Sequence, residues 1–357
     1  MDNSYKSMTS DDKTIEYVLL RYFRDLTLLT RWTLLKMDFD AIEKIDANTW
    51  FNKFEGTSAE EGKRLAKRMI QFEIIAKIII LIEDLAILAE SRLRNTNYYE
   101  LLDKKKTIDK GNCTKSDLEE DVGLITKNFY SKLDSLSDDE ICRIVSYSKP
   151  EKFNFDKDCI SLLKVCIERD IKEIRRILKI IGDFGKEHHP VFRRYKHAGF
   201  PMLPEFPIIN ELPDYLKKFD FLSSVPVNQE DPFKEPKIIP FSKDVLEGYS
   251  IIATGLDRLL GDIAKNRIVC IQKNLDCIPS VGYFSGQTFT VEEHEKLMKK
   301  LEQFNVDFPS NNTSFNFGVD NHFAKSDSWY EKLPDFLHES RQRTKIDKEY
   351  NEKLRNT

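Results

Sequence analysis

The sequence has no apolar run long enough to cross a lipid bilayer. The most apolar run, Ile78-Ile-Ile-Leu-Ile82, is bounded by Lys77 and by Glu83-Asp84, whereas a spanning helix needs about twenty predominantly apolar residues. The first fourteen residues are polar and charged, and they contain no apolar segment of the kind that a signal peptide requires. These two absences favour a cytoplasmic protein that does not enter a membrane.

Cysteine pairs and cofactor motifs are also missing. The six cysteines form no CxxC pair, and they are Cys113, Cys142, Cys159, Cys166, Cys270 and Cys277. This spacing excludes a zinc framework and favours buried, reduced thiols. The chain contains no P-loop, no GxGxxG pattern and no GxSxG elbow. The sequence therefore predicts neither a metal nor a cofactor.

Neither sign of charge dominates the chain. It has 56 Lys and Arg residues against 60 Asp and Glu residues, a net charge of −4 and a pI near 6.0. Such a balance gives no overall attraction to nucleic acid or to an anionic membrane, so any binding of a polyanion depends on a local basic patch. At 357 residues with 40% hydrophobic content, the chain can bury a sizeable core.

No strong alternation of apolar and polar residues predicts β-strands, and apolar residues recur instead at steps of three and four. This period predicts helices over about 14–37 and 58–94, helices that begin after Ser116 and Ser137, and a helix that ends at Gly185. Further helices are expected from Ser242 to about 274, over about 290–304 and over about 329–352. The apolar stripe expected for the first helix consists of Ile15, Val18, Tyr22, Leu26, Leu29 and Trp32.

Proline is concentrated in one part of the chain. Eight of the thirteen prolines lie between residues 199 and 240, and proline excludes regular helix, so we expect an extended segment there. The fold class predicted is therefore all-α, a bundle of long amphipathic helices with an irregular, proline-rich insertion. We expect an N-terminal helical region at 1–185, an irregular segment at 186–241 and a C-terminal helical region at 242–357, packed as one unit.

The stretch Gly185–Pro201 concentrates the chemistry of this chain, since it holds three of the six histidines. Pro190 suits a first helical turn, and Gly199 suits a helix end, so a short helix is expected over 190–198. His189, Arg193 and His197 are four residues apart and would share one face of that helix. Arg194 and Lys196 would flank this face.

Such a face suits a phosphodiester. An imidazole can remove or return a proton near neutral pH, and a guanidinium can hold two phosphoryl oxygens without a metal. Over residues 172–197, eight basic residues stand against three acidic ones, which gives a net charge of +5 before any histidine is protonated. On an amphipathic helix, however, the ordinary role of such charges is contact with solvent.

The segment Arg193-Arg-Tyr-Lys-His197 resembles the arginine-to-histidine motif of HEPN domains, although the interval is shorter here than the family's usual one. The resemblance implies a helical bundle, a metal-independent ribonuclease acting on RNA or nucleotide phosphates, and pairing as a homodimer. It also implies that His197 is the catalytic acid and base and that Arg193 binds phosphate. From their place on or beside the same face, we expect Arg194, Lys196 and His189 to be further phosphate-binding residues.

One alternative stays open at this point. Non-catalytic relatives of the HEPN family exist, and the same residues could belong to a helical binding or assembly protein whose basic loop contacts an acidic partner. The two readings differ in whether His197 and Arg193 face solvent or pack against apolar neighbours.

Overall fold

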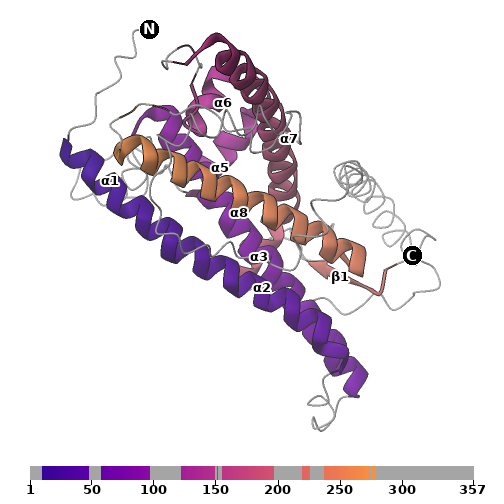
Figure 1. Ribbon diagram of the computed structural model, residues 1–357. Helices are drawn as coiled ribbons and strands as arrows, with labels where there is room; N and C mark the ends of the chain where they lie inside the picture. Colours follow the sequence, from indigo (N-terminus) through magenta and orange to yellow (C-terminus); the bar gives the residue numbers. More distant parts are fainter. Residues whose placement is uncertain are drawn as a thin grey trace, which may run out of the picture. The chain divides into compact units, whose positions relative to one another are not determined.

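The described part of the chain is almost entirely helical, which confirms the predicted all-α class. In this computed structural model, the residues described are 10–47, 58–96, 122–148, 151, 155–196, 219–225, 237–272, 275 and 277. Four long helical stretches dominate these residues, together with shorter helices and one pair of strands (Figure 1).

Two compact units divide the chain, and each draws on separate stretches of sequence. The first unit takes its described residues from Met1–Thr30, Leu81–Gly182 and Gly255–Ser314, and the second from Arg31–Ile80 and Asp183–Thr254. Each of the four long helical stretches contributes residues to both units. The division expected at 185/186 and 241/242 stays a prediction, because most of its middle region lies outside the described residues.

The N-terminal helical stretch contains a π-helical segment. Helix α1 (Ser10–Tyr22) continues through the π-helix η1 (Phe23–Leu28) into α2 (Leu29–Lys44), which a short 3-10 helix, η2 (Ile45–Ala47), follows. Its deeply buried apolar residues are Leu20, Phe23, Leu28, Leu35 and Ile42. A π-helical turn accommodates one extra residue, which explains the step of five residues from Phe23 to Leu28.

The apolar stripe predicted for this stretch is wrong. Ile15, Val18, Tyr22 and Leu26 are each more than half exposed, Leu29 is 38% exposed, and Trp32 is only partly buried. Between residues 15 and 23 the buried side lies one position away, at Glu16, Leu20 and Phe23. The helical stretch also extends to Lys44, beyond the end at about residue 37 that the sequence predicts.

Helix α3 (Ala59–Arg94) confirms the long helix predicted over 58–94, without an interruption near Gly62. Ser58 begins it as expected, since the Ser58 Oγ accepts a hydrogen bond from the Glu61 amide at 3.2 Å. Between Leu81 and Arg92, nearly every side chain is buried. A helix buried all round is surrounded by other elements, so this half of α3 lies at the centre of the first unit.

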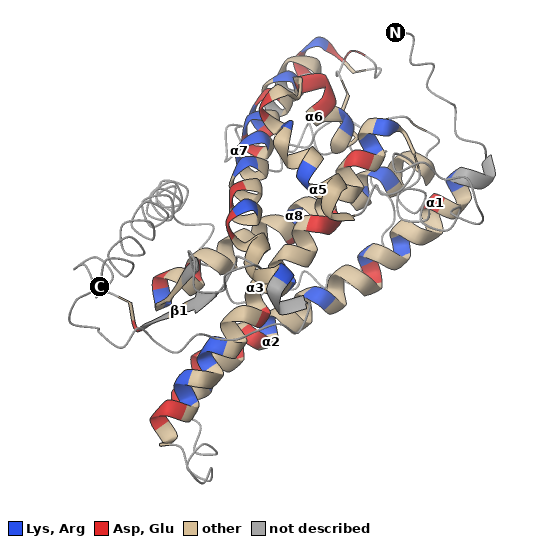
Figure 2. Ribbon diagram, turned by 180° about the vertical axis from the view of Figure 1, so that it is seen from behind, with Lys and Arg blue, Asp and Glu red and all other residues tan. Residues whose placement is uncertain are grey.

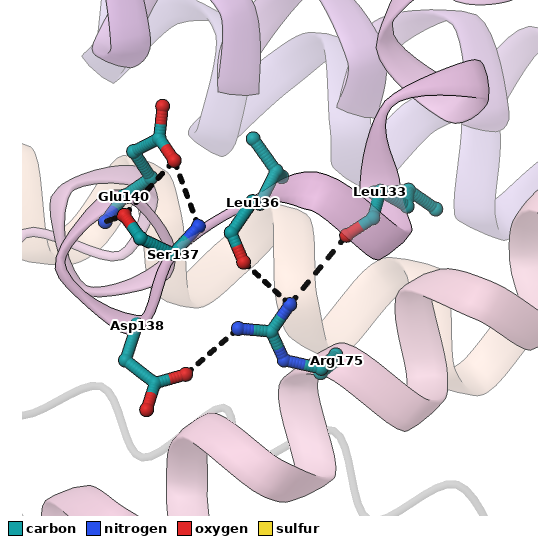
Figure 3. Close-up of polar contacts among 6 residues, drawn as sticks. All are labelled: Leu133, Leu136, Ser137, Asp138, Glu140 and Arg175. Atoms are coloured by element: carbon teal, nitrogen blue, oxygen red, sulfur yellow. Dashed lines mark hydrogen bonds and ion pairs between the residues drawn. The ribbon is translucent and has the colours of Figure 1, made fainter.

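The region after α3 confirms the cap predicted at Ser137. Helix α5 (Val122–Ser131) and the 3-10 helix η4 (Leu133–Ser135) precede α6 (Asp138–Ile144), and Ser137 and Glu140 form a reciprocal capping box. Arg175 joins this turn to the next helix. Its guanidinium donates to the Leu136 carbonyl at 2.7 Å and to Asp138 at 2.7 Å (Figure 3).

Helix α7 (Lys157–Lys196) corrects two predictions, because it runs through Gly185 and through Pro190 without a break. One side of the helix is buried at steps of three and four, at Leu163, Ile167, Ile171, Ile174, Leu178 and Ile181, and Phe184, His188 and Val191 continue this stripe with the same steps. Burial of this face outweighs the low helix propensity of glycine and the amide that proline lacks. The predicted end at Gly185 and the separate helix over 190–198 are therefore wrong.

The proline-rich segment contributes two strands to the second unit. Strand β1 (Phe221–Val225) pairs antiparallel with β2 (Lys237–Phe241), with Ser223 opposite Ile239. Pro240 is tolerated because a two-stranded sheet has only edge strands. The Pro240 carbonyl accepts a hydrogen bond from the Gln71 side chain of α3 at 2.7 Å.

Helix α8 (Lys243–Gln272) confirms the helix predicted from Ser242. The Ser242 Oγ accepts from the Val245 amide at 3.2 Å and so caps its first turn. The helices expected over 290–304 and 329–352 lie outside the described residues. Among the helices that are described, none is both long and apolar enough to span a membrane.

Candidate phosphate-binding face

The predicted site residues fall at the C-terminal end of α7. His189 and Arg193 both lie in this helix, where His189 is partly buried and Arg193 is exposed. Arg194 and Lys196 also belong to the helix, but the positions of their side chains are outside the description, and His197 follows the last described residue. His189 and Arg193 are therefore about one helical turn apart in α7. The prediction that His197 shares their face concerns a residue outside the described part of the chain.

One face of this helix end carries three groups that can bind an anion. Lys186, His189 and Arg193 are separated by three and four residues within α7, so that they lie along the same side of the helix. With a rise of 1.5 Å per residue, Lys186 and Arg193 are about 10 Å apart along the axis. We call these three residues the α7 face, and all of them belong to the second unit.

The ring of His189 is held at the edge of this face. It lies edge-on to the ring of Phe192, with 6.2 Å between the ring centroids, and Phe192 is itself buried. A partly buried imidazole beside an exposed guanidinium can donate a hydrogen bond to an oxyanion that the guanidinium holds. The α7 face thus offers both a fixed charge and a titratable donor.

Two other basic residues of the stretch 172–197, Arg175 and Arg176, bind within the protein. Arg175 is bound to the turn before α6, as described above, and Arg176 forms an ion pair with Glu173 at 3.0 Å. Basic and acidic residues accordingly alternate along much of α7 (Figure 2). The net charge of +5 that the sequence suggested is therefore spread over groups with different roles.

The residue that sequence analysis missed is His188, which is buried and belongs to an aromatic cluster. Its ring stacks on Phe184 at a centroid distance of 4.1 Å and lies edge-on to Tyr249 at 5.7 Å. The Nδ1 atom is 3.2 Å from the Phe184 carbonyl, and the Nε2 atom is 3.4 Å from the Tyr249 hydroxyl. If Nδ1 carries the proton, it donates to the carbonyl and Nε2 accepts from the hydroxyl.

This arrangement gives His188 a structural role in joining α7 to α8 within the second unit. A signal for it was present in the sequence, because position 188 continues the apolar stripe from Ile181 and Phe184. The predicted helix end at Gly185 excludes position 188 from the stripe, whereas the continuous helix includes it.

A second group of charges is buried in the first unit and ties α1 to α8. Arg267 binds both carboxylate oxygens of Glu16, at 3.0 and 2.6 Å, and Arg92 of α3 lies 4.0 Å from the same carboxylate. Burial lowers the pKa of Arg92 to about 10, and the nearby Arg267 adds to this effect. All three side chains are more than nine-tenths buried, which is typical of a structural ion-pair network.

Two partly exposed carboxyl groups on α8 have raised pKa values. Burial raises the pKa of Asp257 to about 6, and burial likewise raises the pKa of Asp262 to about 6. The Oδ2 atom of Asp262 is buried and makes no hydrogen bond to the described residues. Within the described part of the chain, no cluster of histidine, cysteine or carboxylate side chains could hold a metal ion.

Comparison with known proteins adds no relatives. No family model, no curated protein and no solved structure matches this chain. The resemblance to HEPN domains therefore stays a prediction.

Proposed function

We propose that this protein binds the phosphate groups of RNA through the α7 face and cleaves the RNA without a metal, as the HEPN resemblance implies. The observation that carries the proposal is the alignment of Lys186, His189 and Arg193 on one side of a single helix. Exposed basic groups spaced along a helix match a polyanion with regularly spaced charges.

In the proposed reaction, His197 takes the proton from a ribose 2′-hydroxyl while the 2′-oxygen attacks the adjacent phosphorus. The bond from phosphorus to the 5′-oxygen breaks, and the leaving oxygen receives a proton from the protonated imidazole or from water. The products are a 2′,3′-cyclic phosphate and a free 5′-hydroxyl. Arg193 binds the phosphoryl oxygens as their negative charge increases.

Binding is tested by fluorescence anisotropy with single-stranded RNA over a range of salt concentrations. Each phosphate contact contributes about 0.7 to the slope of log K against log salt for a single strand, so Lys186→Gln with Arg193→Gln should lower the slope by about 1.4. Lys127→Gln is the matched control, because Lys127 is an exposed lysine of α5 and belongs to the first unit, whereas the α7 face belongs to the second. An unchanged slope in the double variant contradicts the proposal.

Cleavage is tested separately, in EDTA, with the 2′,3′-cyclic phosphate as the product measured. We expect His197→Ala to abolish cleavage while leaving RNA binding within about threefold, because a general base contributes to the transition state. Equal cleavage by the wild-type protein and the variant contradicts the catalytic part of the proposal.

The second candidate is a non-catalytic protein whose basic face contacts an acidic polypeptide. The engagement of Arg175 and Arg176 in intramolecular pairs favours it, since their charge serves the fold rather than a polyanion. Competition decides between the candidates. If polyglutamate displaces RNA at equal charge concentration and no cleavage occurs, the protein is the acidic-partner binder.

A further inference from the structure

One guanidinium group in the first unit is buried without completed hydrogen bonds. Arg92, in the last turn of α3, is 5% exposed, and its Nε and Nη1 atoms make no hydrogen bond to the described residues. The carboxylate with which it pairs, that of Glu16, is 4.0 Å away, which is too far for a hydrogen bond. Buried donors of this kind require an explanation, and a bound ion is one that chemistry offers.

The carboxylate of Glu16 cannot serve two arginines equally. Arg267 donates to both of its oxygens, at 3.0 and 2.6 Å, and Arg267 is buried as deeply as Arg92. Burial and then the charge of Arg267 lower the pKa of Arg92 to about 10, and Glu16 does not offset them. A charge taken out of water disfavours folding unless a charge of opposite sign accompanies it. A second anion beside Arg92 would supply that charge.

The other buried carboxylate in this part of α3 has partners of its own. Glu90 is 1% exposed, and it binds Arg94 at 3.0 Å and also Lys132. Positions 90 and 92 are separated by about 200° around the helix axis, so Glu90 and Arg92 leave α3 on different sides. Glu90 is therefore not the missing counter-charge.

Two buried hydroxyl groups close to the same helix end also lack partners. Thr96 and Ser146 lie two residues beyond the ends of α3 and α6, and neither the Thr96 Oγ1 nor the Ser146 Oγ bonds to a described residue. The two helix ends are neighbours, since the Arg143 guanidinium of α6 approaches the Leu93 carbonyl of α3 at 3.5 Å. Hydroxyl groups can donate to an anion, as a guanidinium does.

From these buried donors we infer that Arg92 binds a phosphate group, either inorganic phosphate or the phosphoryl group of a small ester. Guanidinium groups bind phosphate oxygens strongly in buried surroundings, and a tetrahedral anion has further oxygens for hydroxyl donors. We call this the Arg92 site. It does not rest on RNA binding or on the HEPN resemblance, because its residues belong to the first unit and the α7 face belongs to the second.

Equilibrium dialysis of the full-length protein against ³²P-labelled phosphate tests the Arg92 site directly. Sodium gluconate keeps the ionic strength constant. We expect about one phosphate per chain, and we expect Arg92→Met to weaken its binding by about 100-fold or more, because the charged donor is lost. Equal binding by the wild-type protein and by Arg92→Met overturns the inference.

Two matched variants show where the phosphate binds. Arg94→Met removes an exposed arginine of the same helix, and it should leave phosphate binding unchanged. Lys186→Gln with Arg193→Gln removes basic groups of the α7 face and should also leave it unchanged. If this double variant loses the bound phosphate and Arg92→Met keeps it, the phosphate binds the α7 face and the inference is wrong.

Stability provides an independent measurement, by urea unfolding followed by circular dichroism in the background of Lys186→Gln and Arg193→Gln. Phosphate at 100 times its Kd should lower the unfolding equilibrium constant about 100-fold, and Arg92→Met should abolish this response. Without phosphate, Arg92→Met should be at least as stable as its parent, because it removes a buried charge.

Two outcomes of the unfolding measurements contradict the Arg92 site. The first is an unfolding constant that phosphate leaves unchanged, which needs no Arg92 variant. The second is a large loss of stability in Arg92→Met without phosphate. It would show that another group of the chain, such as an ionised Cys270, whose charge acts on Arg92, already neutralises the guanidinium.

Competition identifies the source of the phosphate group. Displacement of the labelled phosphate by glycerol 3-phosphate assigns the Arg92 site to a small phosphate ester, whereas displacement by unlabelled phosphate alone assigns it to the free anion. Displacement by chloride at equal ionic strength and equal concentration shows a general halide site and overturns the inference.

Discussion

At the residue scale, neighbouring histidines of α7 have different roles because a helix turns by about 100° at each residue. His188 points to the buried stripe and binds Phe184 and Tyr249, whereas His189 lies at the margin of the α7 face. Two histidines that are adjacent in the sequence therefore face different surroundings and do not belong to one site. Of these two histidines, His189 is the one that shares a side of α7 with Arg193.

Gly182 is the residue at which a single added methyl group should have the clearest effect on stability. A Cβ atom there would lie 2.7 Å from the Tyr130 ring, and Tyr130 is buried with its hydroxyl donating to the Ile82 carbonyl at 3.2 Å. We expect Gly182→Ala to lower the free energy of unfolding by about 1–3 kcal/mol, because the ring cannot move aside freely. Urea denaturation followed by circular dichroism measures this change.

Gly261 is the control for that substitution, since a Cβ atom at this helical position meets nothing within 4 Å. Gly261→Ala should raise the free energy of unfolding by about 0.5–1 kcal/mol through helix propensity alone. If Gly182→Ala is stabilising as well, the close approach of α7 to Tyr130 is not what requires glycine. Adding Tyr130→Leu should remove the cost of Gly182→Ala.

At the scale of the element, the π-helix η1 keeps the buried side of α1 in line with the buried side of α2, which a continuous α-helix of the same length could not do. Phe23 and Leu28 are both buried although they are five residues apart. One residue of η1 is therefore surplus to an α-helix with the same buried side.

Deleting Thr27 should be tolerated for this reason. The deletion converts the step from Phe23 to Leu28 into four residues, which an α-helix accommodates while Leu35 and Ile42 stay in phase. We expect the free energy of unfolding to change by no more than about 1 kcal/mol, because π-helical hydrogen bonds are exchanged for α-helical ones. Thermal and urea unfolding of the deletion variant provide the measurement.

Deleting Lys36 is the matched comparison, because it removes an exposed residue of α2 where no surplus exists. It would rotate the following residues by about 100°. Asp38 would leave its ion pair with Lys77, and Ile42 would leave its contact with Phe241. Equal stability of the two deletion variants would mean that η1 does not absorb a residue.

At the scale of the whole molecule, the partly buried carboxyl group of Asp262 should make stability depend on pH. Asp262 has a pKa of about 6 in the folded protein, raised by burial from 3.8, so the native state binds more protons than the unfolded state between these values. Stability should therefore fall as the pH rises from about 4 to about 6, and the penalty is complete above that range.

Asp262→Asn should remove this penalty. We expect it to raise the free energy of unfolding at about pH 7 by about 1–2 kcal/mol and to have a smaller effect at about pH 4. Urea unfolding at a series of pH values measures the difference, with Asp40→Asn as a control at an exposed position of α2. A loss of stability at neutral pH would show that the carboxylate has a partner that stabilises its charge.

Much of the fold could be predicted because its local signals agree with its packing. The start of α3 after Ser58, the cap at Ser137 and the start of α8 after Ser242 follow from side chains that bond to nearby amides. For the candidate site, the structure shows that His189 and Arg193 are four residues apart in one helix, as the sequence indicated, and that they bind phosphate stays a prediction. Its surroundings could not be predicted, because Phe184 and Tyr249 are 65 residues apart in the sequence and meet only in the folded unit.

The sequence by itself determined the class of the protein, since a period of three to four residues and well-placed caps specify helices without reference to distant residues. The tertiary structure decided which side of each helix is buried. In α1, the pairing of Glu16 with Arg267 turns an apolar row toward solvent, and in α7, the packing of Phe184 and His188 carries the helix past Gly185. Both outcomes depend on partners far along the chain, because burial free energy is gained only when two surfaces meet.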